Sequence, residues 1–300
     1  NYAKETCCIG RGLAAITPNK TKVSTEFIFW LLKGKNNELN SLGTGSTFKA
    51  ISKKVLEETK VPDISLEKQT AYSNILEKLY FIITHRRTQL EKLDLLVKAR
   101  FVEMFGDVDL TPQKSEWTTV SEIGTVVGGS TPKTSIEEYW DGDLKWITPA
   151  ELNLDTGYLY DSIRKITKAG AESCSLQLMP INTVILTSRA PIGKVAIAGT
   201  EFYCNQGFKN IICKDTINPR YLYSLLLFNT DYLNSLGRGA TFKEISKAIV
   251  EKIRIPIPQI ELQNQFADFV KQVDKSKVAV QKELDKAQML FDSLMQEYFG

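Results

Sequence analysis

Two stretches of the chain carry hydrophobic residues at spacings that alternate between four and three. The residues between them are mostly polar, which is the heptad pattern of helices that pack lengthwise along a narrow seam. Each stretch is about 38 residues long, or roughly 57 Å as a helix. The seam positions are Tyr72, Leu76, Leu79, Ile83, Leu90, Leu93 and Val97 in the first stretch, and Phe266, Val270, Val273, Val280, Leu284, Ala287, Phe291 and Leu294 in the second.

The two heptad stretches belong to an internal repeat. Residues 41–106 recur at residues 235–300 without a gap, at a constant offset of 194 and with 20 identities in 66 positions. Unrelated sequence separates the copies, which excludes a solenoid of short contiguous repeats. The repeat predicts two similar halves, each a variable segment followed by a shared connector.

A seam this narrow is unstable alone in water, so each helix needs a partner. The simplest partner is the other copy in the same chain, which predicts an intramolecular helix pair. The alternative is that both helices form the core of a larger helical bundle. Arg86 and Lys277 fall on seam positions, where single polar residues often fix the register of paired helices.

Residues 107–234 have a different texture. Glycine and proline divide this part into short pieces, and several of these are rich in β-branched residues or alternate in polarity, as strands do. The expected strands are 144–147, 183–186, 194–197 and 209–212, with a helix over 219–236 and an extended piece over 253–258 before the second long helix. This part is therefore expected to be a mixed α/β domain with many short strands.

Composition narrows the class of protein. A length of 300 residues suits two or three domains, and 43% hydrophobic with 24% charged residues fits a folded chain with a real core. No apolar run reaches the roughly 18 residues of a membrane span. The five cysteines include no C-x-x-C pair, so reduced thiols in the cytoplasm are expected.

The residues of common catalytic and metal centres are missing from the sequence. A single histidine, His85, argues against His-based zinc sites and a histidine general base. The glycine-rich stretches 43–45 and 237–239 do not fit a phosphate-binding loop, so turns are expected there. The chain also lacks the N/D-P-P-Y/F motif of methyltransferases, and the acidic residues at 141–145 fit a solvated turn. We therefore expect no catalytic residue and no metal site.

Four motifs and the repeat together resemble the specificity subunit of type I restriction–modification systems. The motifs that resemble one of its target recognition domains are EWTTVSEIGTVVGGSTPKTSIEEYWDGDLKWIT, ILTSRAPIGKVAIA, CNQGFKNI and YLYSLL. The repeated segment IPIPQIELQNQFADFV, with its long helix, resembles the conserved regions of the same family. The resemblance covers essentially the whole chain.

The family's order implies four parts: a C-terminal remnant of a first recognition domain (1–40), a central conserved region (41–106), a second recognition domain (107–234) and a distal conserved region (235–300). The first domain is expected to be truncated, because the chain starts without methionine and is shorter than two full periods. The expected fold class is α+β: mixed α/β target recognition domains joined by two long conserved helices that form an intramolecular antiparallel coiled coil.

The resemblance also implies a non-catalytic role. The family reads a bipartite double-stranded DNA target, and its paired helices dock two methyltransferase subunits, which restriction/translocase subunits join. S-adenosylmethionine, ATP and Mg²⁺ are expected only on these partners, and no membrane partner is expected. Two alternatives stay open: a half-size specificity subunit that acts as a homodimer or in a type II-like system, and a coiled-coil structural adaptor without DNA binding.

The candidate DNA-binding residues lie in loops beside the expected strands. Acidic residues outnumber basic ones by 15 to 11 in residues 107–234, so any basic patch must be local. Arg and Lys read guanine or clamp phosphate, whereas Asn and Gln read adenine; solvated cations and a plain polar turn are the alternatives. The candidates are Ser130, Thr131, Lys133, Arg189, Lys194, Asn205, Gln206, Lys209 and, in the first domain, Arg11. Trp117, Trp140 and Trp146 are expected to pack rather than to stack on bases.

Overall fold

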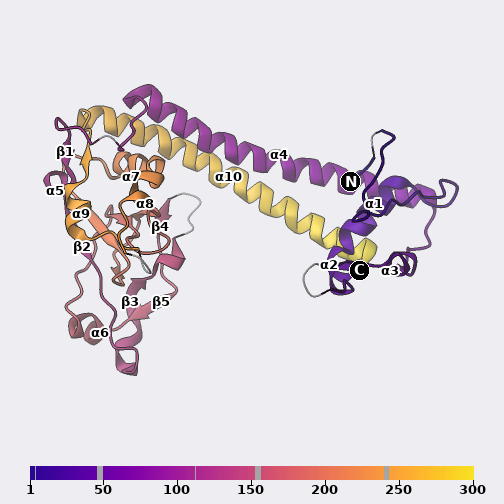
Figure 1. The fold of residues 1–300 in the computed structure, drawn as a ribbon, viewed down its shortest axis with the longest axis horizontal. Helices are drawn as coiled ribbons and strands as arrows, with labels where there is room; N and C mark the ends of the chain where they lie inside the picture. The colour runs from indigo at the N-terminus through magenta and orange to yellow at the C-terminus, as the bar shows by residue number, and fades with distance from the viewer. Residues whose placement is uncertain (4, 46–49, 112, 153–156, 240–242) are drawn as a thin grey trace. The chain divides into compact units, whose positions relative to one another are not determined.

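The chain forms two compact units in the computed structural model, which describes all residues except 4, 46–49, 112, 153–156 and 240–242. The first unit comprises Asn1–Lys92 and Val278–Gly300, and the second comprises Leu93–Lys277. Each of the two long helices contributes one part to each unit (Figure 1). The four-part division expected from the sequence stays a prediction, since these units follow packing and not the boundaries of the repeat.

The long helices are α4 (Leu66–Phe105) and α10 (Ile260–Phe299), each of 40 residues. Neither contains an internal glycine or proline, so nothing in the sequence interrupts their backbone hydrogen bonds. The N–H of Gly106 bonds to the carbonyl of Val102 at 2.8 Å, and its φ of 81° is the left-handed conformation in which helices commonly end. The predicted length of about 38 residues is therefore close to the observed one.

In the first unit the two helices run antiparallel. Tyr72 stacks on Tyr298 with ring centroids 3.7 Å apart, and further along α4 a nitrogen of Arg86 lies 2.6 Å from a carboxylate oxygen of Glu283. Residue numbers thus rise along α4 as they fall along α10. The seam buries Leu76, Ile83, Leu284, Ala287 and Phe291, and half-buries Tyr72, Leu79, Leu90 and Leu294.

The second unit shows the same antiparallel sense. Phe101 of α4 packs edge-on against Phe266 of α10, with centroids 5.4 Å apart, and Lys277 Nζ lies 2.7 Å from Asp94 Oδ1. Here Phe266, Val270 and Val273 are buried and Leu93 and Val97 are half-buried; Val280, in the first unit, is also buried. The polar seam residues Arg86 and Lys277 therefore each meet a carboxylate of the opposite helix, which fits their predicted role in setting the register.

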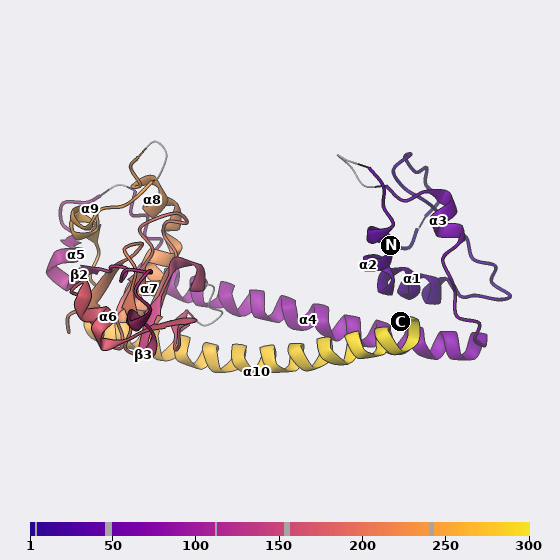
Figure 2. The same ribbon diagram turned by 90° about the horizontal axis from the view of Figure 1, so that it is seen from below.

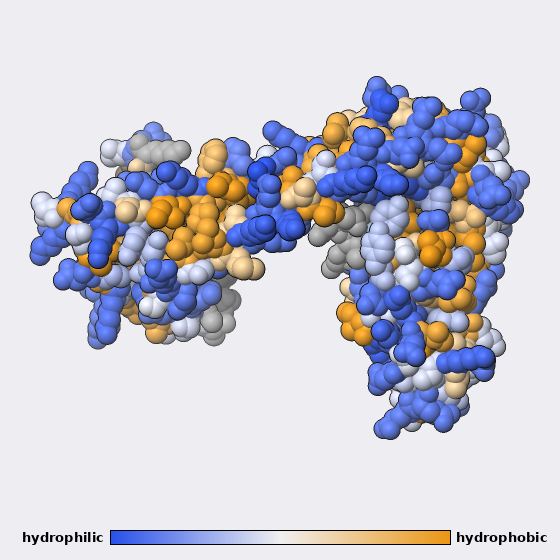
Figure 3. Space-filling view, turned by 180° about the vertical axis from the view of Figure 1, so that it is seen from behind, coloured by the Kyte–Doolittle hydropathy of each residue, from blue (hydrophilic) through white to orange (hydrophobic). Residues whose placement is uncertain are grey.

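Three short helices complete the first unit: α1 (Thr25–Gly34), α2 (Asn36–Ser41) and α3 (Lys53–Glu57). Ser24 is the N-cap of α1, and its hydroxyl accepts the N–H of Phe27. Helix α1 lies beside the C-terminal part of α10 (Figure 2). Its buried Trp30 meets Phe291 edge-on at 5.7 Å. The seam between α4 and α10 is thus also covered by a third helix, α1. Figure 3 shows apolar side chains reaching the surface of this unit among charged ones.

The second unit is built on two sheets and a two-stranded ladder. The five-stranded sheet has the order β2–β9–β6–β7–β4, the three-stranded sheet has the order β5–β3–β8, and β1 pairs with β10. The strands are β1 (Thr118–Thr119), β2 (Gly124–Gly128), β3 (Trp140–Ile147), β4 (Tyr158–Leu159), β5 (Arg164–Ile166), β6 (Val184–Leu186), β7 (Val195–Ala198), β8 (Tyr203–Cys204), β9 (Lys209–Cys213) and β10 (Arg254–Ile255). The predicted strands fall on β3, β6, β7 and β9.

The remaining helices of the second unit are short. They are α5 (Val120–Ile123), η1 (Glu137–Tyr139), η2 (Pro149–Glu151), α6 (Lys168–Ser173), α7 (Pro219–Phe228), α8 (Thr230–Ser235) and α9 (Lys247–Lys252). The helix predicted over 219–236 is therefore two helices, which meet at Asn229. The side-chain amide of Asn229 bonds to the backbone of Val108 and Leu110, so the break holds the chain that follows α4. The extended piece predicted at 253–258 contains only the two-residue strand β10.

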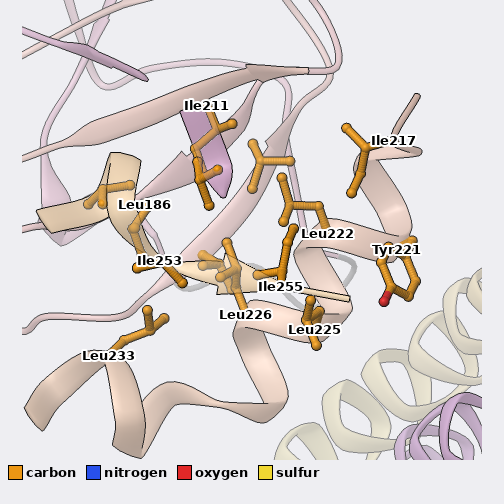
Figure 4. Close-up of a cluster of buried hydrophobic side chains, with 14 of the residues drawn as sticks. Leu186, Ile211, Ile217, Tyr221, Leu222, Leu225, Leu226, Leu233, Ile253 and Ile255 are labelled. Atoms are coloured by element: carbon orange, nitrogen blue, oxygen red, sulfur yellow. The ribbon is translucent and has the colours of Figure 1, made fainter. Parts of the chain in front are cut away.

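The five-stranded sheet packs against a core on each face, and its inner strands β6 and β7 are buried throughout. In β6, Val184 and Leu186 point into one core, where Leu222 and Leu226 of α7 cover them (Figure 4). Ile185, between them, points into a second core with Ile147, Phe202 and Phe208, on the side of the three-stranded sheet. This alternation is the period of two that a strand imposes, and because both faces are buried the strand is wholly apolar.

The structure extends the internal repeat beyond the sequence match. Helices α7, α8, α9 and α10 each begin 194 residues after α1, α2, α3 and α4. The first two pairs lie upstream of the repeat that sequence identity revealed. The shared element is therefore a short helix pair, a third short helix and a long helix, present once in each copy of the repeat.

A buried glutamine fixes the same joint in both copies. Gln69 Oε1 accepts the N–H of Ser24 at 2.9 Å, and its amide nitrogen donates to the carbonyls of Lys22 and Ile64. Gln263 repeats all three bonds with Asn218, Thr216 and Pro258. A buried glutamine of each long helix thereby forms a hydrogen bond with the backbone at the start of a short helix, α1 or α7.

Within the described parts of the chain, no helix combines the length and apolar character that crossing a bilayer requires.

Two adjacent isoleucines of α4 test the seam. Ile83 is 2% exposed and Ile82 is 41% exposed. Ile83→Ala should lower the free energy of unfolding by about 2–5 kcal/mol through the cavity it leaves, whereas Ile82→Ala should change it by no more than about 0.5 kcal/mol. Urea denaturation followed by circular dichroism measures both; equal losses would contradict the seam.

Candidate nucleic-acid interface

The predicted loop at 130–133 lies against the turn at 205–207. The N–H of Ser130 donates to the carbonyl of Cys204 at 3.0 Å, and Thr131 Oγ1 donates to Gln206 Oε1 at 2.7 Å. Gly129 makes this approach possible, because a Cβ there would lie 2.1 Å from the carbonyl oxygen of Cys204. Two segments more than seventy residues apart in the chain thus present their polar groups together.

Two indoles of β3 hold the loop at its two ends. Trp146 Nε1 donates to the carbonyl of Ser130 at 3.1 Å, and Trp140 Nε1 donates to the carbonyl of Lys133 at 3.3 Å. Both rings are buried and meet edge-on at 5.1 Å. They therefore pack, as expected, but they also orient a candidate DNA-binding loop. Trp117 is half-buried against the first core.

The turn at 205–207 is held by its own side chain. Asn205 Oδ1 accepts the N–H of Gly207 at 2.9 Å, which is the geometry of an Asx turn. The backbone N–H of Asn205 donates to the carbonyl of Ile147. The Asn205 oxygen is therefore engaged within the turn, and the oxygen of the exposed Gln206 side chain accepts from Thr131.

The next polar group along this surface is a carboxylate with two cations. Arg189 Nε lies 3.0 Å from Glu244 Oε2, and Lys209 Nζ lies 3.2 Å from Glu244 Oε1. Lys209 also donates to the hydroxyl of the buried Ser188 at 3.2 Å. Ser188 in turn donates its N–H to the carbonyl of Gly207, which connects the cations to the turn.

The two neighbouring cations favour the ionised form of Glu244. Burial alone would raise the pKa of Glu244, but hydrogen bonds from Lys209 and Arg189 and their positive charges outweigh burial, so the pKa lies below its ordinary value. Glu244 is therefore ionised at neutral pH and offsets part of the positive charge of its two neighbours.

The other candidates are placed differently. Lys194 is half-buried, and its backbone pairs with Thr187 at the base of the loop that carries Arg189. Lys133 is exposed at the end of the loop held by the two indoles. Arg11 is exposed in the first unit and so lies outside this cluster.

The structure thus links six of the predicted residues through one chain of contacts, which we call the polar rim: Ser130, Thr131, Arg189, Asn205, Gln206 and Lys209. Sequence reasoning missed Glu244, which joins the two cations. It also missed Arg164, an exposed side chain whose guanidinium lies 3.8 Å from the Trp140 ring centroid. No periodicity marks either residue; only the contacts of the folded chain reveal them.

The polar rim carries groups that are suited to binding. It offers guanidinium, ammonium, amide and hydroxyl groups, which suit base edges and phosphate oxygens. Across the described ranges, no group of three or more His, Cys, Asp or Glu residues could hold a metal ion. Asp141 and Asp143 lie on β3, where Lys145 donates to Thr200 instead of pairing with either carboxylate.

The chain combines a mixed α/β domain that carries the polar rim with two long paired helices. The model of the type I restriction modification DNA specificity domain matches residues 1–94 and 112–287. The chain belongs to that family, and its α+β fold is the family's.

Curated relatives are similar over parts of the chain. A Methanocaldococcus jannaschii protein, the type I restriction enzyme MjaIX specificity subunit, is 41% identical over 184 residues, which are 60% of this chain and 43% of the relative. The EcoR124I/EcoR124II specificity subunit of Escherichia coli is 26% identical over 71% of this chain and 53% of its own length. The chain thus spans about half the length of these relatives.

Solved structures share the fold. The S subunit of a type I restriction–modification system from M. genitalium superposes with a TM-score of 0.62 at 16% identity, over 94% of this chain and 74% of that one. The HsdS subunit from Thermoanaerobacter tengcongensis gives a TM-score of 0.51 at 19% identity, over 95% and 72%.

Adjacent glycines test the contact between the loop and the turn. Gly129→Ala should disrupt it, because the added Cβ would meet backbone oxygen atoms of Cys204 and Asn205 at 2.1 and 2.3 Å. Gly128→Ala should be tolerated, since its nearest neighbour would lie at 3.7 Å. Hydrogen exchange should rise at 130–133 and 204–207 in the first variant only; the same exchange in both would contradict the contact.

Proposed function

We propose that this chain is a non-catalytic specificity subunit that reads part of a bipartite double-stranded DNA target. The observation that carries the proposal is the polar rim, on a unit whose family is the DNA specificity domain. Six residues from four segments are connected there although the unit as a whole is not basic. A local rim suits a reader that relies on base edges and leaves much of the DNA clamping to other subunits.

Each part of the rim has a distinct chemistry toward DNA. Arg189, half-exposed, suits bidentate binding to guanine, and Gln206 suits adenine. Ser130 and Thr131 suit a phosphate or a base edge. Lys133 and Lys194 flank the rim and suit phosphates. Arg11 is the corresponding candidate of the first unit.

We further propose that two methyltransferase subunits dock on the long helices and that restriction/translocase subunits join them. In the second unit, Leu95 and Leu96 of α4 are 65% and 47% exposed; in the first unit, Met289 and Leu290 of α10 are 73% and 50% exposed. These two pairs are equivalent positions of the repeat. Two equivalent exposed apolar pairs suit two copies of one partner. S-adenosylmethionine, ATP and Mg²⁺ would belong to these partners, and the whole assembly would act in the cytoplasm.

Methylome sequencing tests the proposed function. Deleting the gene from its host should abolish adenine methylation at one split sequence, and the wild-type chain should restore it. Arg189→Ala should fail to restore that pattern, because it removes a base-reading group. Lys168→Ala, which removes an exposed cation outside the rim, is the matched control and should restore it. Methylation that is unaffected by the deletion would overturn the proposal.

Paired substitutions test the docking positions. Leu95→Ser with Leu96→Ser should remove one methyltransferase copy from the complex, and Met289→Ser with Leu290→Ser should remove the other. Native mass spectrometry counts the copies. Ile163→Ser, at an apolar residue that is also exposed but lies outside the long helices, is the control. Two copies retained by the fourfold variant would exclude these positions.

A further inference from the structure

Glu244 reaches the polar rim from the repeated part of the sequence. Its backbone forms an antiparallel bridge with Arg189 and another with Arg238, and the N–H of Ile245 donates to the carbonyl of Ser188 at 2.9 Å. Glu244 and Ile245 therefore pair, through isolated bridges, with the base of the loop that carries Arg189. This backbone pairing directs the Glu244 side chain toward both cations.

The two cations differ in how firmly they are held. Lys209 is 12% exposed and bonds to both Glu244 and Ser188, whereas Arg189 is 47% exposed and bonds to Glu244 through one nitrogen, Nε. The hydrogen bond to Glu244 uses Nε, so a bidentate contact with a base would use the terminal nitrogens Nη1 and Nη2. A guanidinium held in this way loses less conformational freedom when it forms a bidentate contact with a base.

The carboxylate also changes which DNA groups the cations prefer. The carboxylate offsets one positive charge, so the electrostatic attraction between this part of the rim and DNA phosphates is weaker. A base edge is selected by hydrogen-bond geometry and loses less when the charge is offset. The same carboxylate would therefore weaken sequence-independent binding and favour sequence-dependent binding.

The first copy of the repeat shows that the backbone does not require the carboxylate. Its counterpart of Glu244 is Ala50, which forms the same antiparallel bridge, with Thr44 in place of Arg238. The local backbone pairing is thus kept by a residue without a charged side chain. What Glu244 adds is its contact with Arg189 and Lys209.

We propose that Glu244 is a specificity-determining positioning residue, which orients Arg189 and restrains Lys209 so that the rim favours base edges over phosphates. The proposal rests on the proposed function, since it presumes that the rim meets DNA. It adds a restraint by Glu244, in the second copy of the repeat, on Arg189 and Lys209 in the variable segment.

The test compares Glu244→Gln with wild type in the complex that copurifies with the tagged full chain. Two probes are used: a fixed mixed-sequence 40-base-pair duplex, and a random duplex pool for selection and sequencing. In the variant, affinity for the fixed duplex at low salt should rise, and its salt dependence should steepen by about 0.9 in log–log slope, which corresponds to one further phosphate contact. Discrimination in the selected pool should fall by about tenfold, within the range that one bidentate base contact supplies.

Controls separate this idea from a loss of fold. Glu201→Gln removes the same charge from an exposed side chain of the same unit and should behave as wild type. Glu244→Ala copies the first repeat and should reproduce the effect of Glu244→Gln, and Glu244→Asp should restore part of the discrimination. Thermal unfolding midpoints should stay within a few degrees of wild type.

Three outcomes would count against the inference. A wild-type complex that binds neither probe would overturn the proposed function and this inference with it. A wild-type complex that selects a sequence, beside Glu244→Gln and Glu244→Ala variants with unchanged slope and discrimination, would overturn the inference alone. Equal effects of Glu201→Gln and Glu244→Gln would attribute the change to net charge and would also overturn it.

Discussion

The arrangement of this chain depends on a buried amide at the start of each long helix. Gln69 and Gln263 each satisfy one backbone N–H and two backbone carbonyls that belong to the entry of a short helix and to the turn before the long one. Leaving such groups buried and unpaired costs about 1–3 kcal/mol each, so the joint has little freedom to vary. The position of α1 on the seam in one unit, and of α7 beside the sheet in the other, follows from it.

In the second unit, the short helix fixed by this joint packs on the strands that precede or carry residues of the polar rim. Helix α7 covers the face of the five-stranded sheet formed by Val184 and Leu186, and the strands it covers, β6 and β9, carry Arg189 and Lys209 at or near their ends. On the other side, the indoles of β3 hold the loop that begins at Ser130. Most of the side chains proposed to read DNA thus lie on loops and turns that are anchored to buried strands, which lowers the entropy lost on binding.

Periodicity identified the parts of the fold that repeat a simple rule. The seam positions of both long helices, such as Leu76 and Phe291, follow the four-three spacing of a heptad. The short apolar runs at 184–186 and 195–198 are typical of a buried strand or helix. Helices α1 and α2 escaped notice because, upstream of residue 41, their similarity to α7 and α8 lies in position and capping more than in identity. The sequence predicted only part of the polar rim. Residue type indicated Arg189 and Lys209 as candidates. Their shared partner Glu244 lies 55 and 35 residues away, and a single sequence carries no signal for contacts at such separations.

The origin of that carboxylate has a consequence for how such chains diversify. Glu244 lies in the second copy of the repeat, where the first copy has Ala50, whereas the strands it acts on lie in the segment between the copies. A new set of strands inserted at the same place would inherit a ready counter-ion for whichever cation it brought to that edge. Novel target preferences could then arise from changes in the inserted part alone, without a separate adjustment of the electrostatic background.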